Sequence, residues 1–297
     1  MIDLHTHSTH SDGFLSPRKL LNLANKTGIE AIALTDHDAV SGLKELRAAA
    51  KKTNIEIING AELTVNYPRT DMEIIALDIP ESSMNAFIKY QQEELKRRES
   101  LAFERIEILK RAGIDICYED VAIDAKGKWR TQIRRPHFVD VLLRKGYIKT
   151  ADEAYQKIFV KGGICPIENK KPPVKKIIKF IKENNAVAIL AHPIHTKHSG
   201  EKLYNMIQKL KGYGLDGIEV LHSSHSLENR KEYLSIIKDL KLITAGGSDF
   251  HGGSAHPENK LGTGNNNNLN IPYFVLEVLK SRQTPKAGYY TELKKYL

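Results

Sequence analysis

The chain begins with a dense group of metal-binding side chains, in the stretch Asp3-Leu4-His5-Thr6-His7-Ser8-Thr9-His10-Ser11-Asp12-Gly13. His5 and His7 alternate with small residues, so on a β-strand their side chains would point to the same side, about 6–7 Å apart. Two imidazoles at that separation can bind one metal ion. Asp12-Gly13 is typical of a turn and would return a carboxylate to the same place.

Beyond this stretch, predicted helices alternate with short apolar strands. Ser16-Pro17 is a typical N-cap and first helical residue, and an apolar strand without polar alternation indicates a sheet covered on both faces. The predicted helices are 17–27 and 42–52, and the predicted strands are 31–34 and 55–58. This alternation predicts an α/β barrel or a doubly wound sheet.

The segment 80–165 breaks the alternation. It contains a long charged helix at 83–112 and shorter helical segments at 119–125, 136–144 and 151–160, with no convincing strand. The alternation then resumes, with predicted helices at 174–184, 201–213 and 228–240 and predicted strands at 186–190, 217–220 and 242–245. We therefore expect a barrel formed by 1–79 and 166–297, with 80–165 as a helical insertion that covers the active site.

Metal-binding side chains recur where the predicted strands end, which is the edge where barrels of this kind build their active sites. The candidates are His5, His7, Asp12, Asp36, His37, Glu62, His192, Asp249 and His251. Histidine and carboxylate ligands without thiolates favour Zn, Mn or Fe. The set is too large for one ion, so two or three are expected. No nucleophile elbow, Walker A loop or dinucleotide fingerprint is present, which favours metal-driven hydrolysis.

Composition adds limits. The 297 residues are 41% hydrophobic and 27% charged, with a net charge of +9. The positive charge favours anionic partners only weakly, because a general lysine bias would produce it too. No apolar run is long enough to cross a membrane and no signal peptide is recognisable. Cys117 and Cys165 match no metal spacing and are expected to be buried thiols, so we expect a cytoplasmic protein without membrane association.

Four motifs in order, DLHTHS (3–8), TDHD (35–38), AHP (191–193) and SDFH (248–251), resemble those of the polymerase and histidinol phosphatase (PHP) superfamily. The phrases Arg135-Pro136-His137 and 215–220 resemble its subfamily of 3′,5′-nucleoside bisphosphate phosphatases and 5′→3′ oligoribonucleases, the TrpH type. The resemblance implies a distorted (β/α)7 barrel with a trinuclear site, commonly loaded with Mn²⁺.

The resemblance also implies a ligand set. One ion would bind His5, His7, Glu62 and Asp249, a second would share Glu62 and bind His192, and a third would bind Asp12, His37 and His251. In the family, the second ion usually gains a histidine just after the glutamate strand. Here Glu73 occupies that place. We therefore expect Glu73 to bind the second ion and to add a negative charge to the site.

The substrate would be held by the insertion. The family uses arginines there, which match Arg98, Arg105 and Arg135, with His137 beside the last. Guanidinium groups suit phosphate, although a charged helix face is also commonly just solvated. Trp129 would stack a base or pack under the insertion.

Two further residues are candidates for catalysis. Asp36 would contact substrate or orient a metal-binding histidine. His222, with His225 nearby, would act as a general acid or have a hydrogen-bonded structural role.

We thus expect a phosphoesterase in which metal-activated hydroxide releases phosphate from a nucleoside 3′,5′-bisphosphate or from the 5′ end of a short RNA. No stable binding to duplex DNA is expected. The alternatives are another phosphomonoesterase, such as one acting on histidinol phosphate, and a non-catalytic metal-binding module.

Overall fold

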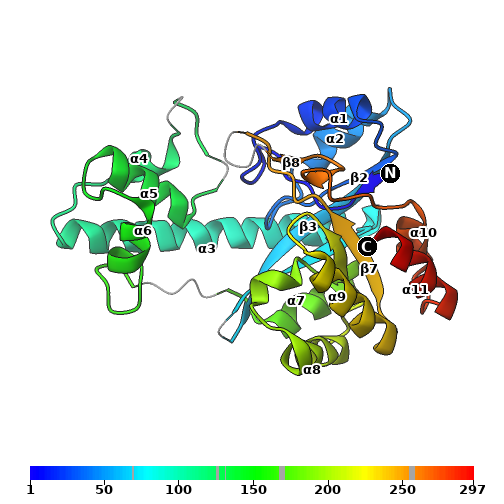
Figure 1. Cartoon of the computed structure of the whole chain (residues 1–297). Helices are drawn as coiled ribbons and strands as arrows, with labels where there is room; N and C mark the ends of the chain where they lie inside the picture. The colour runs from blue at the N-terminus through cyan, green and yellow to red at the C-terminus, as the bar shows by residue number, and fades with distance from the viewer. Residues whose placement is uncertain (69, 125–126, 131, 167–170, 254–257) are drawn as a thin grey trace. The chain divides into compact units, whose positions relative to one another are not determined.

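The computed structural model describes residues 1–68, 70–124, 127–130, 132–166, 171–253 and 258–297. The chain divides into a barrel unit, Met1–Ile88 with Lys171–Leu297, and a helical unit, Lys89–Lys170. Helix α3 (Met84–Arg111) begins in the first unit and continues into the second (Figure 1).

The barrel unit is built on a seven-stranded sheet in the order β1-β2-β3-β4-β5-β6-β7. The strands are β1 (Ile2–Asp3), β2 (Ala31–Leu34), β3 (Glu56–Tyr67), β4 (Thr70–Leu77), β5 (Val187–Leu190), β6 (Gly217–His222) and β7 (Ile243–Gly247). Backbone hydrogen bonds also link the two outer strands, from Leu4 N to Gly246 O (3.1 Å) and from Asp249 N to His5 O (2.9 Å). The sheet therefore nearly closes into a seven-stranded α/β barrel, as the sequence predicts.

One strand departs from the expected alternation. The sequence interpretation assigned no strand to 70–77, yet β4 pairs antiparallel with both β3 and β5. Every other ladder of the seven-stranded sheet is parallel. Because β4 runs in the opposite direction, its amino-terminal half lies at the edge where the parallel strands end, and Glu73 pairs with Thr64 on β3.

Helices cover this sheet. They are α1 (Pro17–Lys26), α2 (Leu43–Ala50), α7 (Val174–Glu183), α8 (Gly200–Gly212), α9 (Leu227–Asp239), α10 (Phe274–Ser281) and α11 (Ala287–Leu293). α7 buries Val174, Ile177, Ile178 and Ile181, the spacing of one helical face. α7 contacts β3 and β5, α9 contacts β6 and α10 contacts β7 (Figure 1).

Local signals explain where the first helix begins and ends. The Ser16 side chain accepts a hydrogen bond from Lys19 N, and Pro17 is the first helical residue. Gly28 follows the helix with φ of +72°, a conformation that costs glycine little. A single short hairpin, β8 (Asn259–Lys260) with β9 (Gly264–Asn265), lies outside the barrel sheet among the described residues.

The helical unit has its own core. Besides α3 it contains α4 (Tyr118–Ala122), α5 (Arg135–Arg144), α6 (Ala151–Glu153) and a π-helical turn, Ala154–Ile158. Its apolar cluster includes Ile106, Leu109, Phe138 and Leu142, all buried.

The structure tests what the composition implies about the two cysteines and about membrane-spanning helices. Neither cysteine forms a disulfide bond in the described part of the chain. Cys117 is exposed rather than buried as expected, whereas Cys165 is buried. Among the described residues, no helix is both long and apolar enough to span a membrane.

Candidate metal centre

All nine residues predicted as metal ligands meet at one edge of the barrel. They follow β1 (His5, His7 and Asp12), β2 (His37), β5 (His192) and β7 (Asp249 and His251), or lie within β3 (Glu62) and β4 (Glu73). Each occurs in at least one group whose ligand atoms lie within 4.8 Å of one another. Parallel strands end at the same edge of a sheet, and residues far apart in the chain converge there for that reason.

Glu62 lies at the centre of the cluster and is completely buried. Its Oε2 is 2.9 Å from His37 Nδ1 and 3.4 Å from His5 Nε2. Its Oε1 is 3.0 Å from His192 Nε2. One carboxylate thus faces histidines from three strand ends, an arrangement that would allow it to bridge two ions.

A second group surrounds Asp12. His251 Nε2 lies 3.3 Å from Asp12 Oδ1, and His37 Nε2 lies 3.6 Å from Asp12 Oδ2. The rings of His7 and His251 stack with centroids 4.1 Å apart. Gly13 permits the fold of this loop, because a Cβ there would come within 2.5 Å of the His7 backbone.

Glu73 reaches the same cluster from β4. Its carboxylate oxygens lie 3.3 Å from His37 Nδ1 and 3.6 Å from His192 Nε2. Glu73 therefore lies close enough to His37 and His192 to share a metal ion with them. It stands at the position where the resemblance implies a histidine.

The cluster chemistry fits divalent cations. Four carboxylates, from Asp12, Glu62, Glu73 and Asp249, share a space lined by neutral or protonated imidazoles. His5 Nε2, Glu62 Oε2 and Asp249 Oδ1 are buried and lack a normal hydrogen bond within the described residues. Buried polar atoms without partners are costly unless a ligand satisfies them, and mixed imidazole and carboxylate donors suit Mn, Zn or Fe.

The protonation states of Glu62, Asp249 and His7 point the same way. Burial alone would raise the pKa of Glu62, but the charges of His37 and His5 outweigh it and hold that pKa well below its usual value. For Asp249, burial would likewise raise the pKa, but the charges of His5, His7 and His251 and the hydrogen bond of His7 together outweigh it and hold that pKa well below its usual value. Burial, with the charge of His251, lowers the pKa of His7 to about 4. Ionised carboxylates and neutral imidazoles are the forms that bind metals. Burial would lower the pKa of His5, His192 and His251, but neighbouring carboxylates outweigh it and raise the pKa of each, so these rings must lose a proton to bind a metal.

Sequence reasoning missed Glu219, a fully buried carboxylate on β6. Its Oε1 lies 3.0 Å from His5 Nδ1, and its Oε2 accepts a hydrogen bond from His192 N at 2.7 Å. It therefore orients ligands from two different strands. The available signal was a glutamate inside an otherwise apolar strand, Gly217-Ile218-Glu219-Val220.

Asp36 has a bracing role. Its carboxylate accepts hydrogen bonds from Ser8 N and Ser8 Oγ (both 2.7 Å) and from Ser11 Oγ (2.6 Å). It belongs to none of the ligand groups found among the described residues. These bonds go to the loop between His7 and Asp12 and not to a histidine ring, so the geometry favours a role in bracing that loop, while direct contact with substrate stays a prediction.

His222 is buried beside the cluster, with its Nε2 4.0 Å from Asp249 Oδ2. Burial holds its pKa well below the usual value. A neutral imidazole is a poor general acid, so the environment favours the structural alternative. His225 is structural in the same sense, because its Nδ1 contacts Val220 O (3.1 Å) and burial lowers its pKa to about 3.

The predicted substrate residues lie in the helical unit. Arg98 and Arg105 are 8% and 5% exposed, so the solvated alternative is wrong for both. Arg135 begins α5, and His137 Nδ1 accepts a hydrogen bond from Arg134 N.

The Trp129 side chain is 64% exposed. The expectation that it packs beneath the insertion is therefore wrong. Its alternative role, stacking on a base, stays a prediction.

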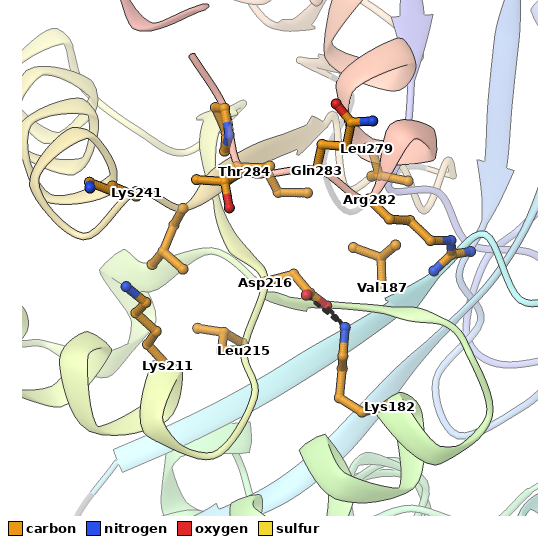
Figure 2. Close-up of a pocket in the computed structure, with 13 residues that line it drawn as sticks. Lys182, Val187, Lys211, Leu215, Asp216, Lys241, Leu279, Arg282, Gln283 and Thr284 are labelled. Atoms are coloured by element: carbon orange, nitrogen blue, oxygen red, sulfur yellow. Dashed lines mark hydrogen bonds and ion pairs between the residues drawn. The ribbon is translucent and has the colours of Figure 1, made fainter. Parts of the chain in front are cut away.

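A separate pocket of about 220 Å³ lies at the opposite edge of the barrel, where β5 and β7 begin (Figure 2). Three cations that line it are engaged: Lys182 pairs with Asp216 at 2.7 Å, Lys211 donates to Leu240 O, and Arg282 pairs with Asp78 at 2.7 Å. Lysines near the ends of helices stabilise the exposed carbonyls there. None of the nine predicted ligands lines this pocket.

Comparisons with known proteins agree with this architecture. Residues 3–165 match the model of the PHP domain. The chain is 30% identical over 251 residues to a 5′-3′ exoribonuclease from Haemophilus influenzae, covering 84% of this chain and 89% of the relative. It is also 30% identical over 256 residues to a 3′,5′-nucleoside bisphosphate phosphatase from Chromobacterium violaceum, covering 84% and 87%.

A solved structure resembles almost the whole chain. It is a protein from Bifidobacterium adolescentis assigned as a metal-dependent phosphoesterase, with a TM-score of 0.72 and 25% identity. The match covers 96% of this chain and 97% of the other.

Proposed function

The chain belongs to the PHP domain family and is a phosphoric ester hydrolase, and we propose that its substrate is a small nucleotide. Either a nucleoside 3′,5′-bisphosphate or the 5′ end of a short RNA would suit it, since two relatives that are 30% identical are named as a 3′,5′-nucleoside bisphosphate phosphatase and a 5′-3′ exoribonuclease. The observation that carries the proposal is the convergence of all nine predicted ligands at the active-site edge of the barrel. Such an enzyme would work in the cytoplasm, where nucleotides and RNA are found.

We propose that the cluster holds two or three ions of Mn²⁺, or of Zn²⁺ or Fe²⁺. Bound ions of this kind lower the pKa of water and stabilise the charge that develops on phosphate oxygens. His5, His7, Glu62 and Asp249 would hold one ion. Glu62, Glu73 and His192 would hold a second, and Asp12, His37 and His251 a third.

Glu73 gives this cluster a different charge from one with a histidine at the same position. A carboxylate there adds one negative charge beside Glu62, and so it attracts a divalent ion more strongly. The extra charge also repels a phosphate that approaches the same ion. We therefore expect Glu73→His to bind the second ion less tightly while improving access for the phosphate.

Substrate phosphates would be bound by the helical unit, which we propose covers the active site. Burial, together with the charge of Arg135, lowers the pKa of Arg105. Like charges held together in a buried place are stabilised by an anion, and guanidinium groups bind phosphate through paired hydrogen bonds.

The substrate class can be tested with Mn²⁺-loaded protein. Release of phosphate is compared for adenosine 3′,5′-bisphosphate, a short 5′-phosphorylated RNA and histidinol phosphate. We expect hydrolysis of one of the first two and much slower hydrolysis of histidinol phosphate. Preference for histidinol phosphate would contradict the nucleotide proposal but not the metal site.

The ligand assignment needs a matched pair of variants. His37→Ala should abolish activity and reduce the number of bound Mn²⁺ ions. His10→Ala is the control, since His10 lies on the same opening loop but bonds Ser41 and belongs to none of the described ligand groups. The reverse pattern would reject the assignment.

A further inference from the structure

An exposed aromatic ring stands next to the candidate metal centre. Phe14 is 62% exposed, the highest value among the large hydrophobic side chains described in the barrel unit. A single exposed phenylalanine is ordinary on a protein surface. Its position in the fold is what makes this one informative.

The backbone of Phe14 is fixed between two predicted ligands. It follows Asp12-Gly13 directly, and Phe14 N donates a 2.7 Å hydrogen bond to His251 O. Gly253 lies against its side chain, because a Cβ built there would be 3.5 Å from the ring. The ring is therefore held in place by the two loops that carry Asp12 and His251.

This side of the cluster carries its two most exposed ligands. The Asp12 and His251 side chains are 35% and 30% exposed, whereas those of His5 and Glu62 are fully buried. A substrate phosphate must approach the cluster from the accessible ligands. Phe14 lies two residues from Asp12, at most about 7 Å along the chain.

We propose that Phe14 is a specificity residue that stacks on the base of the nucleotide whose phosphate reaches Asp12 and His251. This proposal rests on the proposed function. It adds a contact to the base, which the metal ligands do not recognise because they bind the phosphate. Aromatic rings stack on any base, so this contact selects for nucleotides without selecting a particular one. Phosphoesters that lack a base would gain nothing from it.

The test compares adenosine 3′,5′-bisphosphate with its abasic analogue, the same sugar bisphosphate without adenine, on Mn²⁺-loaded protein. Stacking is worth about 1–3 kcal/mol per base, so Phe14→Ala should lower kcat/KM for the nucleotide by about 5- to 150-fold. The abasic analogue should change by less than about twofold, since it makes no stacking contact. Phe14→Tyr keeps a ring and should restore the nucleotide preference.

Trp129→Ala is the matched comparison, because its indole is equally exposed but lies in the helical unit. Equal losses on both compounds in Phe14→Ala would overturn the proposal and indicate a disturbed metal loop. So would a nucleotide-specific loss that appears only in Trp129→Ala.

Calorimetric titration of both compounds separates this proposal from the proposed function. If the wild-type protein hydrolyses neither compound, and does not hydrolyse the short 5′-phosphorylated RNA either, the proposed function fails. The stacking proposal then still requires tighter binding of the nucleotide than of the abasic analogue, and loss of that difference in Phe14→Ala. Equal affinities in the wild-type protein would overturn it.

Discussion

At the scale of single residues, the orientation of His5 depends on Glu219. Glu219 Oε1 lies 3.0 Å from His5 Nδ1, so in the neutral ring that binds a metal the proton belongs on Nδ1, and Nε2 faces Glu62 and Asp249 with its lone pair. A carboxylate behind a ligating histidine fixes its tautomer and increases its basicity. The same carboxylate holds His192 N, so one buried charge aligns two strand ends.

Glu219→Gln removes that charge with little change of volume. We expect Mn²⁺ to bind about 10- to 100-fold more weakly, the usual cost of losing such a partner, as measured by calorimetry. Glu228→Gln, an exposed change on the following helix, is the control. Unchanged Mn²⁺ affinity in Glu219→Gln would show that His5 is oriented by its other neighbours.

His192 makes metal binding depend on pH. Burial would lower its pKa, but the hydrogen bond and charge of Glu62 outweigh it and raise the pKa from 6.5 to about 9. In the metal-free protein, this proton stabilises the fold fully below pH 6.5, and the contribution is lost as the pH rises through about 9. A metal ion on His192 must displace the proton.

We therefore expect Mn²⁺ affinity to rise with pH between about 6.5 and 9, and binding at pH 7.5 to release protons. Calorimetry in two buffers of different ionisation enthalpy measures the release. His10→Ala should release as many protons as the wild-type protein. Binding heats that do not depend on the buffer would contradict this assignment.

At the scale of elements, barrel closure relies on one close approach. A Cβ on Gly247, the last residue of β7, would lie 2.2 Å from His5 Cβ and 2.4 Å from His5 N. Only glycine lets β7 come this close to the first strand. Both strands carry predicted ligands just beyond this point, so the contact sets the width of the ligand cluster.

Gly247→Ala should destabilise the protein by about 1–3 kcal/mol, as overpacking does, and should weaken Mn²⁺ binding by displacing His5. Gly212→Ala is a matched control at the end of α8, where nothing lies within 4 Å of an added Cβ. It should leave binding unchanged. Thermal unfolding with and without Mn²⁺ distinguishes the two variants, and equal behaviour would refute the role of Gly247.

The same scale shows where sequence reasoning succeeds. Strand 31–34 and the long helix, expected at 83–112 and found at Met84–Arg111, carry strong local patterns. β4 was not predicted because an alternation of helices and parallel strands leaves no place for a strand directly after β3. The direction of a strand also leaves no local pattern in the sequence. Glu219 was missed because its role arises from His5, which is 214 residues away in the chain.

At the scale of the whole molecule, the two units divide the proposed work. The barrel unit contains every predicted metal ligand, and the helical unit contains every predicted phosphate-binding arginine. A variant in the helical unit should therefore change substrate binding without changing metal binding. Arg105 allows the sharpest version of this test.

Arg105 is buried, lies 5.9 Å above the Phe138 ring, and its Nε has no hydrogen-bond partner among the described residues. The Arg105→Met substitution replaces a buried cation close to Arg135 with an apolar side chain. The melting temperature of the substrate-free protein should therefore rise. Loss of a charge-assisted hydrogen bond to phosphate, about 1.5–3 kcal/mol, should lower kcat/KM by roughly 10- to 150-fold. Mn²⁺ affinity should not change.

Lys110→Met, an exposed change on the same helix, should alter none of the three measurements. A lower melting temperature in Arg105→Met with unchanged kcat/KM would make Arg105 a structural residue. A change in Mn²⁺ affinity would show that the two units do not act separately. The expected result is a more stable but less active enzyme. A buried cation without a full set of partners destabilises the substrate-free protein, whereas the same cation binds the phosphate of the substrate.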